Sequence, residues 1–179
     1  MIPASLDFPR TRRRTWTAAL LVLGAALFAS PARAENKLGG HFGAVFPIIT
    51  HADGNTTDIG EDFKIGFPMG ITVKPGGKWA FDLELVPVLD FNDDGPLGVP
   101  LTVHPGVLRD LGGNWTFGMR MAFDIGGASW GFTPLINKGF PKGNHAWFVE
   151  AVVPIRFQDD AAGEGSTAIG FGVHLGVGF

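Results

Sequence analysis

The chain has 179 residues, which is enough for one domain, and it contains no cysteine. The absence of cysteine excludes disulfides, thiolate metal sites and a cysteine nucleophile. The formal net charge is −3, and 27 glycines together with 13 prolines disfavour long helices beyond the N-terminus.

Residues 1–34 have the three parts of a secretory signal peptide. Four arginines between positions 10 and 14 precede an uncharged apolar run over 16–29, and Ala32-Arg33-Ala34 forms an Ala-x-Ala cleavage site. The apolar run has 14 residues, whereas a membrane-spanning helix needs about 20. We therefore expect cleavage before Glu35 and not a retained membrane anchor.

Removal of the signal peptide changes the charge of the protein. It takes away five of the 14 basic and one of the 17 acidic residues, which leaves 9 and 16 and a net charge of −7 for residues 35–179. A chain this acidic, with no basic patch interleaved with aromatic residues, is a poor candidate for nucleic-acid binding. We expect no nucleic-acid partner.

The mature chain alternates apolar and polar residues in eight segments, and a period of two predicts β-strands. The third segment, for example, places Phe81, Leu83 and Leu85 on one face and Asp82 and Glu84 on the other. The predicted strands span residues 38–50, 62–74, 79–91, 99–108, 115–125, 129–137, 145–157 and 167–179. The connections between them are polar or glycine-rich, at 51–61, 75–78, 92–98, 110–114, 126–128, 138–144 and 158–166.

The last predicted strand ends the chain on an aromatic residue. From Ile169 to Phe179 every second residue is apolar, and the residues between are glycine apart from His174. This ending resembles the closing strand of bacterial outer-membrane β-barrels, whose terminal aromatic residue belongs to the signal read by the barrel-assembly machinery. Together with the eight strands, it indicates a likeness to the small OmpA/OmpX/OmpW-like barrels.

The resemblance covers residues 38–179 as architecture. It implies an all-β fold, an eight-stranded antiparallel up-and-down transmembrane β-barrel. It also implies a Gram-negative outer-membrane location, reached by export through the signal peptide. Outer-membrane lipid, lipopolysaccharide and the barrel-assembly machinery are the expected partners of a monomer. Both termini and the short turns would then face the periplasm, and the acidic loops would face outward.

Alternation alone does not decide which face of the strands is inside, because a soluble calycin-type barrel would enclose the apolar face. Two observations favour the membrane arrangement. The apolar face carries no charge in any predicted strand, and the opposite face of the first and last strands is rich in glycine, such as Gly43 and Gly176. A solvated strand seldom uses glycine, whereas a narrow barrel interior needs small residues opposite large ones.

The membrane arrangement places charged side chains inside the barrel. Buried charges must be paired, so we predict a structural polar network that plugs the interior and argues against a wide channel. Asp124 and Arg156 are expected nearer the outer mouth. The predicted members are His41, Glu84, Arg120, Asp124, Glu150, Arg156 and His174, with His104 and Asp82 also on the inward face.

Aromatic residues mark both ends of the predicted strands. Three turns lead into a tryptophan at intervals of about one hairpin, which predicts an interfacial aromatic girdle of Trp79, Trp115 and Trp147 level with Phe179. An outer belt is predicted from Phe63, Phe91, Trp130 and Phe157.

Six prolines conflict with regular strand pairing. Each removes a hydrogen bond from the ladder, and a closed barrel has no free edge, so we expect bulges or shorter strands. These residues are Pro47, Pro68, Pro87, Pro105, Pro134 and Pro154.

The function that these patterns predict is structural or surface-interacting, with no enzyme activity, cofactor or metal. Residues 90–95 match the start of a calcium loop, but position 101 is Leu101 where such a loop requires Glu. Two alternatives stay open. One is a narrow passage for small apolar molecules, which would need an apolar interior. The other is a lipid A-modifying enzyme, which would need a serine beside a histidine. The serines of the mature chain are Ser129 and Ser166.

Overall fold

The computed structural model describes residues 37–91, 99–127, 129–159 and 165–179. The predicted signal peptide, the predicted loop 92–98 and the centre of the last predicted loop lie outside these residues. Eleven strands form one antiparallel sheet, and the described chain contains no helix, so none there is long and apolar enough to span a membrane. The prediction of an all-β antiparallel fold is confirmed.

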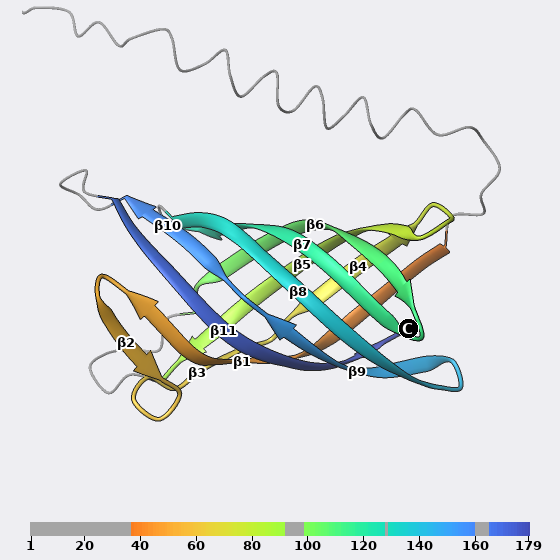
Figure 1. Ribbon diagram of the computed structural model, residues 1–179, viewed down its shortest axis with the longest axis horizontal. Helices are drawn as coiled ribbons and strands as arrows, with labels where there is room; N and C mark the ends of the chain where they lie inside the picture. Colours follow the sequence, from red (N-terminus) through yellow and green to blue (C-terminus); the bar gives the residue numbers. More distant parts are fainter. Residues whose placement is uncertain (1–36, 92–98, 128, 160–164) are drawn as a thin grey trace, which may run out of the picture. The chain divides into compact units, whose positions relative to one another are not determined.

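The sheet closes on itself into a ring of eight strand positions (Figure 1). Its strands are β1 (Lys37–Ala52), β2 (Asn55–Asp58), β3 (Lys64–Gly66), β4 (Met69–Lys74), β5 (Trp79–Asp90), β6 (Leu101–Gly112), β7 (Trp115–Ile125), β8 (Ser129–Lys142), β9 (His145–Val152), β10 (Ile155–Asp159) and β11 (Gly165–Gly178). β3 and β4 share the position between β1 and β5, and β9 and β10 share the position between β8 and β11. Pairing of β1 with β11 closes the ring.

Two prolines divide strands that the sequence predicts as continuous. The predicted strand 62–74 is split into β3 and β4 before Met69, and the predicted strand 145–157 is split into β9 and β10 before Ile155. Proline has no N–H for the ladder, but its carbonyl still accepts a hydrogen bond. Gly43 N–H donates to Pro68 O at 2.9 Å, and Gly170 N–H donates to Pro154 O at 2.8 Å, so the ring continues across both breaks.

The other prolines lie inside strands. The register of β1 against β11 shifts just after Pro47, as expected for an irregularity at proline. The carbonyls of Pro87 and Pro134 accept hydrogen bonds from the N–H groups of Phe67 and Val153 at the two breaks, at 2.9 Å and 3.0 Å. Pro105 lies opposite Leu83 without a shift in register.

Four predicted connections are too long, which corrects the strand boundaries. One is 158–166, because β10 runs on to Asp159 and β11 begins at Gly165. The predicted loop 51–61 contains β2, which folds back on β1 through Asp53 and Gly54 with φ of 51° and 78°. Both residue types tolerate positive φ, so this tight turn has suitable residues. β6 and β8 run on to Gly112 and Lys142, so the predicted turns 110–114 and 138–144 shrink to residues 113–114 and 143–144.

Adjacent residues of the same strand face opposite environments. Leu83 is 48% exposed and the next residue, Glu84, is 2% exposed. Met119 is 38% exposed and Arg120 is 3% exposed, and the same contrast holds for Leu175 and His174 in β11. The outer face of the ring is therefore apolar, and charged side chains lie in its interior.

The two ends of the ring differ in their connections. The β4–β5, β6–β7 and β8–β9 turns and the C-terminus lie at one end, here called the hairpin end (Figure 1). β2 lies at the opposite end, here called the loop end, where β5, β7 and β10 finish.

Candidate functional site

Arg120 in β7 is the centre of a buried polar network. Its Nε donates to Asp82 Oδ2 at 2.9 Å, its Nη1 donates to Glu150 Oε1 at 2.9 Å, and its Nη2 lies 3.4 Å from Glu84 Oε2. All four residues are buried inside the ring. Charge-assisted hydrogen bonds of this kind are the strong ones. One guanidinium thus connects β5 and β9, which are not neighbours in the sheet, across the interior.

Histidines supply further donors to the same carboxylates. His41 Nε2 lies 2.9 Å from Glu84 Oε2, and His174 Nδ1 lies 3.2 Å from Glu150 Oε1. An ionised carboxylate only accepts hydrogen bonds, so both ring nitrogens donate. The structure therefore brings the predicted residues His41, Glu84, Arg120, Glu150 and His174 together.

Arg156 and Asp124 lie at the edge of this group. Arg156 Nη2 is 3.1 Å from His104 Nε2, and His104 Nδ1 is 3.0 Å from Glu84 Oε1. Because a guanidinium can only donate, His104 Nε2 accepts from Arg156, and His104 Nδ1 is the nitrogen that faces Glu84. Asp124 accepts a hydrogen bond from Thr102 Oγ1 and stands outside the group around Arg120.

Asp82 and two neutral residues belong to the network although they were not among its predicted members. Thr72 Oγ1 donates to Asp82 Oδ1 at 2.7 Å, and Asn137 Nδ2 donates to Glu150 Oε2 at 3.3 Å. Each donor lies directly opposite its acceptor on the neighbouring strand. Alternation already places Asp82 on the inward face, but the pairing with its partner requires the strand register, which alternation within one strand does not provide.

Glycines make room for the network. A Cβ at Gly70 would overlap the His41 ring, and a Cβ at Gly43 would lie 2.7 Å from His174 Nε2. A Cβ at Gly106 would lie 2.6 Å from Arg120 Cγ. Glycine weakens a strand, so these positions have a packing reason for it.

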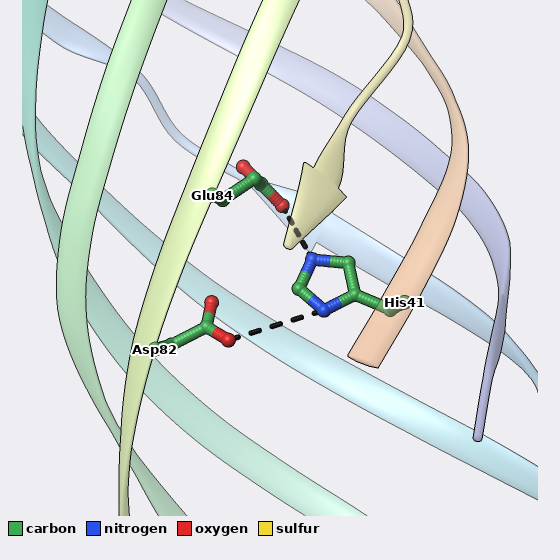
Figure 2. Close-up of side chains that lie close together, drawn as sticks. All are labelled: His41, Asp82 and Glu84. Carbon is green, nitrogen blue, oxygen red and sulfur yellow. Dashed lines mark hydrogen bonds and ion pairs between the residues drawn. The ribbon is translucent and has the colours of Figure 1, made fainter. Parts of the chain in front are cut away.

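His41, Asp82 and Glu84 are the group in the described chain that comes nearest to a metal site (Figure 2). One ligand atom from each lies within 4.8 Å of the others. However, the two ring nitrogens of His41 face different carboxylates, Nε2 toward Glu84 and Nδ1 toward Asp82 at 3.9 Å (Figure 2). Arg120 pairs with both carboxylates, so a metal cation would meet a fixed positive charge. The geometry fits an ion-pair network better than a metal centre.

A cavity of about 640 Å³ connects the hairpin end with the polar network. Residues of all three hairpin turns line it, and it reaches His41, Arg120 and Glu150. On the other side of the network, the next inward residues of β5, β7 and β9 are apolar and buried. They are Val86, Ala122 and Val152. The interior is therefore hollow between the network and the hairpin end, and it is filled by apolar side chains on the loop-end side of the network.

The serine required for a lipid A-modifying enzyme is not placed beside a histidine. Ser129 Oγ is buried and has no hydrogen-bond partner in the described part of the chain. Ser166 lies opposite Gln158 at the start of β11. Neither position provides a serine activated by a base.

The predicted aromatic residues lie on the outer face at both ends. Trp79, Trp115, Trp147 and Phe179 are exposed at the hairpin end. At the loop end the ring centroids of Phe63 and Phe91 are 5.4 Å apart, and those of Trp130 and Phe157 are 4.9 Å apart.

Comparison with known proteins gives the chain no family. No protein-family model, no curated protein and no solved structure matches it. The functional argument therefore depends on the geometry of the ring.

Proposed function

We propose that the mature chain is an integral β-barrel of the bacterial outer membrane, plugged by its polar network, with a structural or surface-interaction role. One observation carries the proposal, which is the inversion of the two faces. Large apolar side chains such as Leu83 and Leu175 are exposed, whereas Glu84 and Arg120 are buried.

The inversion supports a membrane location because exposing apolar surface to water is unfavourable. Burying apolar surface stabilises a protein in water by roughly 25 cal/mol per Å², and monomeric soluble proteins rarely expose apolar patches larger than a few hundred Å². Here every strand position of the ring carries exposed large apolar residues, including Phe42, Ile71, Phe117 and Ile136. Hydrocarbon around the ring would remove that surface from water, and ring closure satisfies the backbone groups that hydrocarbon cannot.

The interior supports a closed barrel. Three buried carboxylates, Asp82, Glu84 and Glu150, converge on Arg120. Buried apolar side chains follow on the loop-end side of this group. An apolar solute would have to displace this charged group. Exposed acidic side chains at the loop end, such as Asp53 and Glu61, would be presented to the outside.

The experiment that tests the proposal is electrophoresis of the refolded protein with and without heating. The mature chain is refolded in phospholipid vesicles, washed with alkaline carbonate, and run in sodium dodecyl sulfate. We expect the protein to stay with the vesicles and the unheated sample to migrate differently from the boiled one. Release by carbonate together with identical migration would overturn the proposal.

Two assays separate this role from the alternatives. Vesicles that contain the protein should show no swelling in isosmotic solutions of small solutes, because the network closes the interior. Lipid A from cells with and without the protein should have the same mass spectrum. Swelling would favour the passage, and a mass change would favour the enzyme.

A further inference from the structure

Charged side chains outside the polar network are sorted between the two ends of the ring. Six of the nine basic residues of the mature chain lie at the hairpin end, and we call them the basic collar. They are Lys37, Lys74, Lys78, Arg109, Lys138 and Lys142. In the described chain, Asp110 is the acidic residue at this end.

The loop end has the opposite sign. Its acidic residues in the described chain include Asp53, Asp58, Glu61, Asp62, Asp90 and Asp159. Lys64 is also there, but its Nζ lies 2.8 Å from Asp62 and 3.2 Å from Asp90, so its charge is already compensated. Among the described residues, the ring therefore carries excess positive charge at the hairpin end and excess negative charge at the loop end.

Two collar cations are held against the aromatic girdle. Arg109 lies opposite Trp79 with its Cζ 5.2 Å from the ring centroid, and Lys138 lies opposite Trp115 with its Nζ 4.9 Å from that ring. Lys138 Nζ also donates to Gly113 O at 2.7 Å. Cation–π contacts fix these charges at the height of the indoles. Indoles prefer the boundary between hydrocarbon and headgroups, so the charges lie where lipid phosphates would be.

We propose that the basic collar binds the headgroups of anionic phospholipids in the leaflet at the hairpin end. This inference rests on the proposed membrane location. Its support is charge complementarity, since the collar extends around the end of the ring beside an exposed apolar surface. A basic residue near an anionic leaflet strengthens association on the order of fivefold.

The test measures which lipid lies next to the collar tryptophans. The mature chain is refolded in phosphatidylcholine vesicles that contain phosphatidylglycerol, with bromine on the acyl chains of one lipid or the other. Brominated chains quench adjacent tryptophan. A Trp130→Phe background removes the loop-end indole, so the remaining indoles of the mature chain are Trp79, Trp115 and Trp147.

We expect phosphatidylglycerol to be preferred at least about fivefold at low salt. The preference should fall toward one near 1 M salt, where the screening length is only about 3 Å. Equal quenching by the two lipids at low salt would overturn the inference, even if the protein is inserted and heat-modifiable. Failure to insert in either lipid would overturn the proposed function and this inference together.

Two variants with the same change in net charge separate the collar from overall charge. The collar variant carries Arg109→Gln, Lys138→Gln and Lys142→Gln. The matched variant carries Asn55→Asp, Thr57→Glu and Gln158→Glu at the loop end. The collar variant should lose most of the lipid preference and the matched variant should retain it. Equal loss in both variants would contradict the inference, and the salt titration of the unmodified protein tests it independently of either variant.

Discussion

The inner and outer faces of the same strands follow different rules. On the inner face the buried charged side chains have named partners, as Arg120 has Asp82 and Glu150. On the outer face the neighbouring residues, such as Met119 and Leu83, are exposed and share only their apolar character. The free energy of unfolding should therefore depend on the identity of the residue at inner positions. At outer positions it should depend only on whether the residue is apolar.

The largest effect is expected at the centre of the polar network. Arg120→Met would leave three buried carboxylates without their shared cation, and breaking a buried ion pair costs about 3–5 kcal/mol. Urea unfolding in phospholipid vesicles measures the free energy of unfolding. Met119→Leu, at the preceding residue of β7 and on the opposite face, is the matched control and should change it by less than about 1.5 kcal/mol. Similar values for the two variants would contradict the difference between the faces.

A charge on the outer face should have the next largest effect. In the proposed membrane, Leu83→Arg would place a guanidinium in hydrocarbon near the middle of β5, at a cost of about 2–4 kcal/mol in unfolding free energy. The apolar change Leu83→Met at the same position should be nearly neutral. Equal unfolding free energies for Leu83→Arg and Leu83→Met in vesicles would show that the outer face does not contact lipid.

Adding a side chain at an interior glycine should lower the free energy of unfolding by less than the two changes above. In Gly70→Ala the new Cβ would overlap the His41 ring and force it away from Glu84, with an overpacking cost of about 1–3 kcal/mol. Gly139→Ala in β8 is the control, because the nearest atom to its Cβ would be 3.7 Å away. Equal unfolding free energies for the two variants would show that the histidine ring is not fixed as the structure places it.

The smallest effect is expected at Asp124. It shares β7 with Arg120, but it accepts a hydrogen bond from Thr102 at the edge of the group. Asp124→Ala should therefore cost about 1 kcal/mol of unfolding free energy, the value of one ordinary hydrogen bond. A cost as large as that of Arg120→Met would place Asp124 in the network after all.

Much of the fold follows from alternation of residue types. The period of two in residues 79–91 and 115–125 predicts β5 and β7 closely, because these strands contain a complete and regular pattern. The breaks at Pro68 and Pro154 are consistent with the missing N–H of proline, although the residue at which a strand resumes depends on the neighbouring strand. β2 is not predicted, because its exposed polar residues give no apolar face to recognise.

The polar network is less predictable from one sequence. Alternation assigns Glu84, Arg120 and Glu150 to one face, but it does not say which of them meet. Contacts such as Thr72 with Asp82 depend on how β4 and β5 are aligned, and a shift of one residue would separate them. The sequence therefore identifies the face of each residue, and the register between strands identifies its partner.

The most direct test of the inverted faces is the environment of spin labels on the outer face. The chain has no cysteine, so Leu83→Cys, Met119→Cys and Leu175→Cys each give one labelling site. Thr57→Cys in exposed β2 is the aqueous control. In vesicles, the three outer-face labels should collide with dissolved oxygen and be shielded from a water-soluble nickel chelate. Labels as accessible to nickel as the control would contradict the membrane assignment.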